Sequence, residues 1–364
     1  MRKNEIYRSY GTDYKEMTKR LLERSDLRSL LPDISSRIAI KPNLATPTPA
    51  DFGGTTHPEV VAGIIEYLQE LGCENIVIAE GSWVGDVTSD AFDYCGYYAL
   101  RDKYHVELID TQKEPGVPVA CGEESVSVCA CVRDWDFLIN VPVLKGHCQT
   151  NITCALKNMK GLIPNEEKRR FHRDGLHRPI ALLNSVIRQD FIVIDHICGD
   201  LNFEEGGNPV HTNRMYLGTD PVQIDAYGCR LMGLRTEDVP YIQLAEKWGA
   251  GRSEIQEGDI VTLNAPEESR TYPAPSGIVN RLTRQVKADS ACSACYASLV
   301  RGLYMAQEEG IRVRTEIAIG QGYRRKSLKG LGIGNCCAGA DFCARGCPPT
   351  ASDVLKLLRE STEH

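Results

Sequence analysis

Short apolar runs alternate with amphipathic stretches through the first two thirds of the chain, and this alternation restricts the fold more than any other feature. Residues 37–40, 75–79, 106–109, 136–141 and 191–195 are predicted to be buried strands, and residues 58–72 and 89–103 to be helices between the first of them. Strand, helix and strand in succession are typical of a parallel sheet with right-handed crossovers. The sequence therefore predicts an α/β fold, a mostly parallel open sheet flanked by helices.

Other segments complete the expected main domain. Helices are predicted at residues 16–31, 179–187, 221–231 and 239–248 and in part of 149–159, and strands at 125–132 and 215–218. Thr56 or His57 is placed to cap the helix that Pro58 opens. Arg, Lys, Glu and His dominate residues 165–177, so we expect an exposed loop or lid there.

The end of the chain is rich in Cys and Gly instead. Cys292-x-x-Cys295 puts two thiolates on one turn, which suits either zinc or an iron–sulfur cluster. A run from Cys343 to Cys347 followed by Pro348 is typical of ferredoxins, whereas zinc ribbons prefer two Cys-x-x-Cys pairs. We expect one 4Fe–4S cluster, with zinc as the alternative. The expected ligands are Cys292, Cys295, Cys336 and Cys347, with Cys337 and Cys343 as alternates.

Length and composition predict the division of the chain into domains and exclude some classes of partner. A chain of 364 residues favours two domains, here 1–264 as the α/β main domain, 265–290 as a linker and 291–364 as a Cys-rich iron–sulfur domain. The net charge of −7 argues against a nucleic-acid partner, and no apolar run is long enough for a membrane span. Nine scattered cysteines without ligand spacing favour a reducing compartment, the cytoplasm.

Polar residues follow the predicted strands where a ligand site is expected. Ligands of open parallel sheets bind outside the carboxyl ends of the strands. Lysines, histidines and amides at these ends predict a cationic cleft for a small carboxylate or phosphate. The candidates for catalysis are Lys145, His147 and Lys41. The candidates for substrate binding are Asn43, Thr56, His57, Glu80, Lys157, Asn158, Lys160 and Asp195. The sequence contains no phosphate-binding loop motif and no nucleophile elbow.

Five short motifs occur in a characteristic order: residues 40–43 (IKPN), 55–58 (TTHP), 140–147 (NVPVLKGH), 155–161 (ALKNMKG) and 217–225 (LGTDPVQID). In them the chain resembles the domain-of-unknown-function family number 362 over residues 37–251. The tail resembles the Cys-x-x-Cys and Gly-Cys-Pro-Pro region found with that family. The resemblance implies an α/β domain with a ferredoxin-like cluster and leaves the reaction open. Gly207-Asn208-Pro209 departs from the Gly-Pro expected in the glycine-rich loop.

These features favour an iron–sulfur oxidoreductase or electron-transfer protein that acts on a small anionic substrate. The sequence shows no flavin or nicotinamide motif, so electrons are expected from a ferredoxin-type redox partner. One alternative is a non-redox lyase or isomerase whose cluster is a Lewis acid or a structural staple. Another is a cluster maturation or scaffold protein, a role that the spare thiols of Cys337 and Cys343 would suit.

Overall fold

An eight-stranded sheet forms the centre of the main domain in the computed structural model, which describes residues 4–266 and 277–361. The strand order is β12-β1-β11-β10-β7-β2-β3-β4. All pairs from β10 to β4 are parallel, whereas β11 is antiparallel to both β10 and β1, which confirms the mostly parallel α/β prediction. The strands are β1 (Ile6–Tyr10), β2 (Ile38–Pro42), β3 (Ile76–Glu80), β4 (Glu107–Asp110), β7 (Phe137–Val141), β10 (Phe191–Asp200), β11 (Pro209–Gly218) and β12 (Ile260–Thr262).

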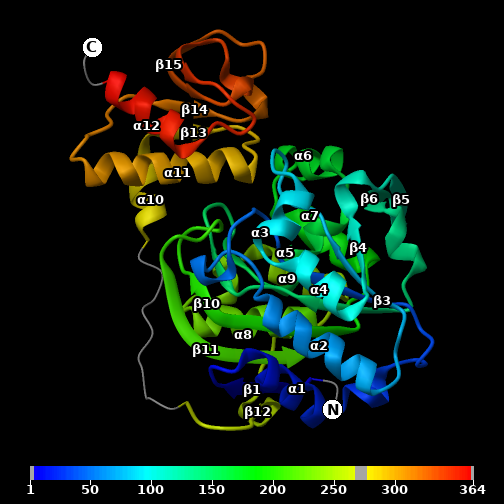
Figure 1. The fold of residues 1–364 in the computed structure, drawn as a ribbon. Helices are drawn as coiled ribbons and strands as arrows, with labels where there is room; N and C mark the ends of the chain where they lie inside the picture. Colours follow the sequence, from blue (N-terminus) through cyan, green and yellow to red (C-terminus); the bar gives the residue numbers. More distant parts are fainter. Residues whose placement is uncertain (1–3, 267–276, 362–364) are drawn as a thin grey trace.

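Helices cover both faces of this sheet (Figure 1). One apolar cluster joins α1 and α2 to one face, and another joins α7, α8 and α9 to the opposite face. Every residue of β2, β3 and β7 is buried, as expected for central parallel strands. The helices are α1 (Tyr14–Arg24), α2 (Pro58–Glu70), α3 (Thr88–Tyr94), α4 (Tyr97–Tyr104), α5 (Ala155–Asn158), α6 (Asn165–Arg173), α7 (His177–Val186), α8 (Pro221–Leu231) and α9 (Pro240–Lys247).

The structure corrects several local predictions. The segment expected as an exposed loop or lid at 165–177 contains helix α6, because Phe171 anchors one side of this charged stretch in the core. The helix predicted at 89–103 is two helices, separated at Gly96, whose φ of +78° is a left-handed conformation. Asp195 lies in the middle of β10, which continues to Asp200, and not at the end of a strand.

Several other strands were not predicted, although a strand was expected at residues 125–132 and β6 (Glu124–Cys129) covers part of that segment. Strands β1 and β12 lie near the two ends of the main domain's sequence, and they pair with each other. Two hairpins, β5 (Gly116–Cys121) with β6 (Glu124–Cys129) and β8 (Lys145–His147) with β9 (Asn151–Thr153), lie outside the main sheet. The hairpin of β8 and β9 occupies residues where no strand was expected, and β9 lies in the segment 149–159 that was expected to be partly helical. No helix of the described residues is long and apolar enough to cross a membrane.

A smaller domain follows, with a four-stranded parallel sheet in the order β13-β14-β15-β16. Its strands are β13 (Val286–Ala288), β14 (Ile317–Ile319), β15 (Leu328–Ile333) and β16 (Ala340–Ala344), and its helices are α10 (Ile278–Leu282), α11 (Ser293–Glu308) and α12 (Ala351–Glu360). Strand β13 falls inside the predicted linker 265–290, of which residues 267–276 lie outside the described residues. In Figure 1 the small domain sits at one end of the main domain, with α11 on the side that faces it.

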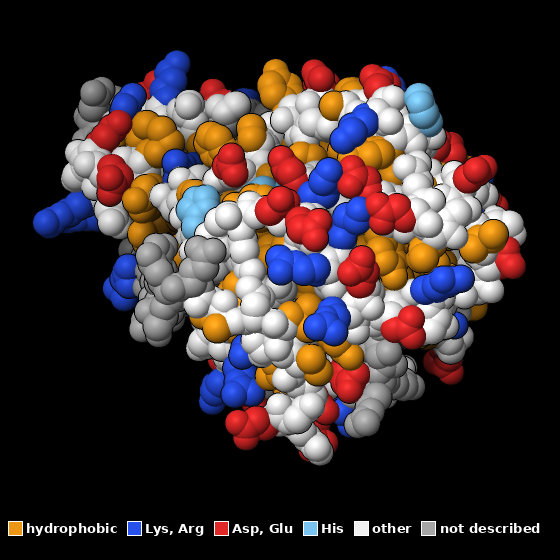
Figure 2. All heavy atoms as spheres, turned by 60° about the horizontal axis from the view of Figure 1, so that its bottom comes forward, with side chains coloured by type: hydrophobic (Ala, Val, Ile, Leu, Met, Phe, Trp, Pro, Cys, Tyr) orange, Lys and Arg blue, Asp and Glu red, His pale blue; other side chains and the backbone are white. Residues whose placement is uncertain are grey.

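Charged side chains of both signs are interspersed over the face shown in Figure 2, with scattered hydrophobic groups between them. Such a mixed surface presents no broad cationic area on this face. Several other lysines, among them Lys41, Lys145 and Lys157, are buried inside the molecule.

Candidate functional site

Strands β2 and β3 carry a buried ion pair at their carboxyl ends. Because the strands are parallel neighbours, their last residues lie side by side, and Lys41 Nζ donates to Glu80 Oε2 at 2.8 Å. The two side chains are only 0% and 3% exposed. Glu80 also accepts from the backbone N–H groups of Gly81 at 2.7 Å and Leu44 at 2.9 Å. The carboxylate is thus fully engaged by the chain itself.

Three asparagines connect this pair to the neighbouring loops. Asn158 Oδ1 accepts from Lys41 Nζ at 3.3 Å and from Asn43 Nδ2 at 3.0 Å, while Asn158 Nδ2 donates to Asn140 Oδ1 at 2.7 Å. Thr56 Oγ1 accepts from the Asn43 N–H at 2.8 Å and donates to the Val141 carbonyl at 2.7 Å. The network fixes the strand ends and explains why amides occur at these positions.

Three further lysines, Lys157, Lys160 and Lys168, are buried beside the network. Lys168 Nζ donates to the carbonyls of Gly81 at 3.0 Å and Ser82 at 2.8 Å, and Lys157 Nζ donates to Thr153 Oγ1 at 3.3 Å. Within the part of the chain that the structure describes, no carboxylate lies within ion-pair distance of these three ammonium groups. The cations lack a local counter-charge.

Burial disfavours the charged form of each of these lysines. It lowers the pKa of Lys157 and that of Lys168 to about 8. For Lys160, burial and then the positive charges of Lys157 and Lys168 hold the pKa well below its ordinary value. An anion bound among them would reverse these shifts, since it would stabilise the charged forms.

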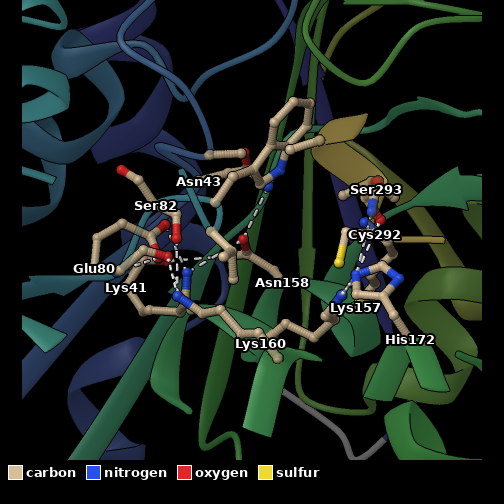
Figure 3. A pocket seen from close by; sticks show the side chains of 18 residues that line it. Lys41, Asn43, Glu80, Ser82, Lys157, Asn158, Lys160, His172, Cys292 and Ser293 are labelled. Atoms are coloured by element: carbon tan, nitrogen blue, oxygen red, sulfur yellow. Dashed lines mark hydrogen bonds and ion pairs between the residues drawn. The ribbon is translucent and has the colours of Figure 1, made fainter. Parts of the chain in front are cut away.

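These groups line one cavity of about 70 Å³, which residues of the small domain close. Figure 3 shows Lys41, Glu80 and Ser82 on one side, Cys292, Ser293 and His172 on the other, and Asn158 and Lys160 between them. Ser293 Oγ donates to Gln149 Oε1 at 2.9 Å and lies 3.3 Å from His172 Nε2, which ties the start of α11 to the main domain. The lining residues include Lys41, Asn43, Glu80, Lys157, Asn158, Lys160, Lys168, His172, Cys292 and Ser293.

Lys168 and His172 were missed by the sequence analysis. Both lie on α6, which was expected to be exposed, yet both side chains are buried. Phe171, the one large apolar residue in a charged stretch, was the available indication that this segment packs against the domain.

Lys145, expected in the cleft as a catalytic residue, does not line the cavity. Its ammonium group donates to Asn43 Oδ1 at 3.2 Å, to the Glu204 carbonyl at 2.7 Å and to the Gly54 carbonyl. Burial and the charge of Lys157 lower its pKa to about 7. The side chain joins three loops of the main domain.

His147 also lies outside the cavity. Its Nδ1 accepts from the backbone N–H groups of Gln149 at 3.0 Å and Thr150 at 3.2 Å, and its Nε2 lies 3.3 Å from Glu204 Oε1. Burial and the nearby lysine charges hold its pKa well below the ordinary value, so the ring is neutral. It organises the turn between β8 and β9.

His57 and Asp195 form a separate buried pair away from the cavity. Asp195 Oδ2 accepts from the His57 backbone N–H and contacts His57 Nδ1, both at 2.8 Å. Burial alone would lower the pKa of His57, but the carboxylate of Asp195 raises it to about 11. His57 occupies the N-cap position of α2, but its side chain makes no cap hydrogen bond. The pair fixes α2 to β10.

Four cysteines line a second cavity, which is formed mostly by the small domain, with Val84 and Arg169 of the main domain completing its wall. They are Cys292, Cys295, Cys336 and Cys347, the ligands expected from the sequence. Cys337 and Cys343 do not line it: Cys337 is fully buried, and Cys343 Sγ donates to the Gly334 carbonyl at 3.6 Å. Burial and then the charges of the other three thiols raise the pKa of Cys295 to about 12, so the set needs a positive group to hold it as thiolates.

The surroundings of these four thiols suit a bound group. Arg324 Nε donates to Cys336 Sγ at 3.3 Å, and Gln321 Nε2 donates to Cys292 Sγ at 3.6 Å. Gly334 has a φ of +81° and no side chain. A Cβ at this position would lie 3.4 Å from Cys295 Sγ, so the glycine leaves space beside that sulfur. Among the described residues, no group of three or more His, Cys, Asp and Glu is arranged to hold a single metal ion. The thiols line the wall of a cavity and do not converge on one point.

The two cavities share part of their walls. Cys292 and Val84 line both the lysine cavity and the cysteine cavity. Gly85, next to Val84, has no room for a Cβ, which would lie 2.2 Å from Pro348 Cδ. The loop after β3 is therefore packed against the last cysteine segment, and the two cavities are neighbours.

Residues 38–230 match the family described as a domain of unknown function (DUF362). A thylakoid-associated protein of Synechocystis sp. is 23% identical over 227 residues, 58% of this chain and 68% of that protein. The cysteine region lies beyond the family match.

Two solved structures are similar in part. One is the lactate racemase apoprotein from Thermoanaerobacterium thermosaccharolyticum, with a TM-score of 0.43 and 11% identity over 62% of this chain and 56% of that chain. The other is a protein from Thermotoga maritima, with a TM-score of 0.38 and 14% identity over 65% and 60%. The chain spans less than two thirds of the length of either.

Proposed function

This chain belongs to the DUF362 family, and from that premise we propose that it is an iron–sulfur oxidoreductase that binds a small anion between its two domains. The observation that carries the proposal is that Cys292 lies in the wall of both the lysine cavity and the cysteine cavity. A substrate among the lysines would therefore lie next to a ligand of the redox centre.

The substrate class follows from the charges. Among the described residues, no carboxylate lies within ion-pair distance of the buried Lys157, Lys160 and Lys168, whereas Glu80 is already paired with Lys41. Ammonium groups in this setting gain most from a carboxylate or phosphate, whose oxygens accept charge-assisted hydrogen bonds. A cavity of about 70 Å³ restricts the anion to a small one.

The redox group that suits the donor set is one 4Fe–4S cluster held by Cys292, Cys295, Cys336 and Cys347. Four thiols around a cavity fit a polynuclear cluster better than a zinc ion, which draws its ligands toward one point. Hydrogen bonds from Arg324 and Gln321 to ligand sulfurs are the kind that tune a cluster. When bound, the cluster would supply one-electron transfer. The free thiols elsewhere fit a reducing compartment, and we place the protein in the cytoplasm.

Protons for the reaction would come from the cavity lysines. Lys157 and Lys168 have a pKa of about 8, so each holds a proton at neutral pH and can release it to a substrate that gains electrons. Of the three residues expected to be catalytic, Lys41 lines the cavity, whereas Lys145 and His147 do not. Lys41 positions Glu80 and Asn158 around the substrate.

A second candidate is a non-redox lyase or isomerase. The same lowered pKa values would let a deprotonated Lys157 or Lys168 abstract a proton from a carbon acid, with the cluster as a structural staple. The apolar core of the small domain contains few residues, so a bound cluster that links its segments would add to its stability.

Anaerobic purification followed by iron, sulfide and zinc assays tests the cluster. Roughly four iron and four sulfide per chain are expected, with an electron paramagnetic resonance signal on reduction. Zinc in their place would overturn the redox proposal, and a cluster that strong reductants leave unchanged would favour the second candidate.

Ligand variants test the assignment of the cysteines. We expect Cys292→Ser to lose the iron, because it removes one of four thiolates. Cys343→Ser is the matched control and should keep its iron, since Cys343 lies outside the cavity. The reverse result would replace Cys292 by Cys343 as a ligand and separate the cluster from the lysine cavity.

A further inference from the structure

A surface groove shares four lining residues, Arg324, Asn335, Cys336 and Cys347, with the cysteine cavity and none with the lysine cavity. Three consecutive basic residues, Arg324, Arg325 and Lys326, line it together with Cys336 and Cys347. Both cysteines also line the cysteine cavity, and Cys347 is exposed. The groove thus gives access from solvent to one side of the proposed cluster, and Cys292 connects the other side to the lysine cavity.

The basic side chains of the groove are free to meet a partner. Arg324, Arg325 and Lys326 are all exposed. None of them forms an ion pair with a carboxylate anywhere in the described chain; Arg324 donates to the Cys336 sulfur, and the Lys326 ammonium group lies over the Tyr323 ring. Exposed charges of this kind contribute little to folding stability and act mainly on association.

The charge of the small domain contrasts with that of the rest of the chain. Residues 286–361 carry eleven Lys and Arg against seven Asp and Glu, a net charge of +4, whereas the whole chain carries −7. The remaining residues therefore carry −11 between them. An acidic protein would be repelled by most of this molecule and attracted to the small domain, which orients its approach.

We propose that this groove is the docking surface for an acidic one-electron carrier protein of the ferredoxin class. The inference rests on the proposed function, because it assigns the place where electrons enter. In each encounter the reduced carrier loses one electron and the cluster-loaded chain gains it, with no bond formed or broken. Two encounters would supply a two-electron reduction of the anion, with the protons coming from the cavity lysines.

The test uses the cluster-loaded full chain and a purified acidic ferredoxin. Arg325→Glu with Lys326→Glu reverses two charges without touching Arg324, which contacts Cys336. Arg312→Glu with Lys356→Glu makes the same change of charge in the same domain, and neither residue lines the groove. Binding of oxidised ferredoxin is measured by biolayer interferometry at low and moderate salt, and cluster reduction by reduced ferredoxin in a stopped-flow instrument.

We expect the groove variant to bind at least tenfold more weakly at low salt and to be reduced correspondingly more slowly. The control should stay within about threefold of the wild type, a margin that allows for its equal change in net charge. Reduction by photoreduced deazaflavin, a small molecule, should be the same in all three proteins. Equal losses in both variants would overturn the assignment of the groove.

Two other outcomes would also overturn it. Tight binding of inorganic phosphate that only the groove variant loses would make the groove a small-anion site. Absence of ferredoxin binding to a chain that has its full iron and sulfide would reject the partner while the proposed cluster stands. A chain that lacks iron and sulfide would instead reject the proposed function first.

Discussion

Two sets of buried lysines lie near the carboxyl ends of the central strands, and they differ in what surrounds them. Lys145 donates to three oxygens of its own chain and lines no part of the cavity. Lys157, Lys160 and Lys168 line the cavity and have no carboxylate within ion-pair distance among the described residues. Burial lowers the pKa in both sets, so a shifted pKa alone does not identify a binding residue. Lys145 also has no carboxylate within ion-pair distance among the described residues, and Lys168 also donates to two carbonyls, so exposure to the cavity is what separates the structural lysine from the binding ones.

The largest expected effect is on the free energy of unfolding, and it tests whether Lys145 is a structural residue. Lys145→Met should lower the free energy of unfolding by about 3 kcal/mol, because it leaves the oxygens of Asn43, Gly54 and Glu204 buried without their donor. Anion affinity should change little in the folded fraction. Urea denaturation followed by calorimetry with small anions measures both, and a large loss of affinity with normal stability would place Lys145 in the site after all.

Lys160→Met should have the opposite effects, a loss of anion affinity without a loss of stability. Removing one ammonium group from the cavity should weaken the binding of a small anion by at least tenfold, about 1.4 kcal/mol, while stability stays the same or rises. Stability should not fall, because in the described part of the chain this buried group has no carboxylate within ion-pair distance. Lys247→Met, an exposed lysine on α9, is the control. Unchanged affinity in the Lys160 variant would contradict the proposed anion site.

A dependence on pH is also expected. Lys157 and Lys168 have a pKa of about 8 in the folded chain and an ordinary value of 10.5 when unfolded, so the unfolded chain binds more protons between these values. Stability of the free chain should therefore rise with pH through this window, by at most about 1.4 kcal/mol per pH unit for each group.

Anion affinity should move in the other direction. It should fall as the pH rises through about 8, because the deprotonated lysines no longer attract the anion. Calorimetry between pH 6.5 and 9.5 measures it, and proton uptake on binding should be seen near pH 8 in buffers of different ionisation enthalpy. An affinity that stays constant over this range would mean that other groups bind the anion.

The sequence predicted the architecture because the central strands are continuous apolar runs and their helices begin and end at recognisable residues. Lys41, Asn43, Glu80, Lys157, Asn158 and Lys160 were predicted as site residues and line the cavity. Lys41, Asn43 and Glu80 were predictable because residues at the carboxyl ends of parallel strands gather at one edge of the sheet, whereas Lys157, Asn158 and Lys160 lie on α5 and the helical turn after it.

What could not be predicted depends on contacts between distant segments. Lys168 and His172 lie on a charged helix whose burial depends on how Phe171 packs. Asp195 and His57 were expected in the site but pair with each other away from the cavity, because β10 continues beyond Asp195. The contribution of Cys292 and Ser293 to the cavity depends on how the two domains are placed, which no local pattern encodes.

The central claim is that the anion site and the redox centre are neighbours through Cys292. The most direct measurement is a redox titration of the cluster-loaded chain, followed by electron paramagnetic resonance, with and without a small anion whose binding calorimetry has established. A negative charge beside Cys292 opposes the addition of an electron, so we expect a lower midpoint potential and, by reciprocity, weaker anion binding to the reduced chain. Each tenfold difference in anion affinity between the oxidised and the reduced chain corresponds to a shift of about 59 mV in the midpoint potential of this one-electron couple. An unchanged midpoint potential with the anion bound would contradict the account.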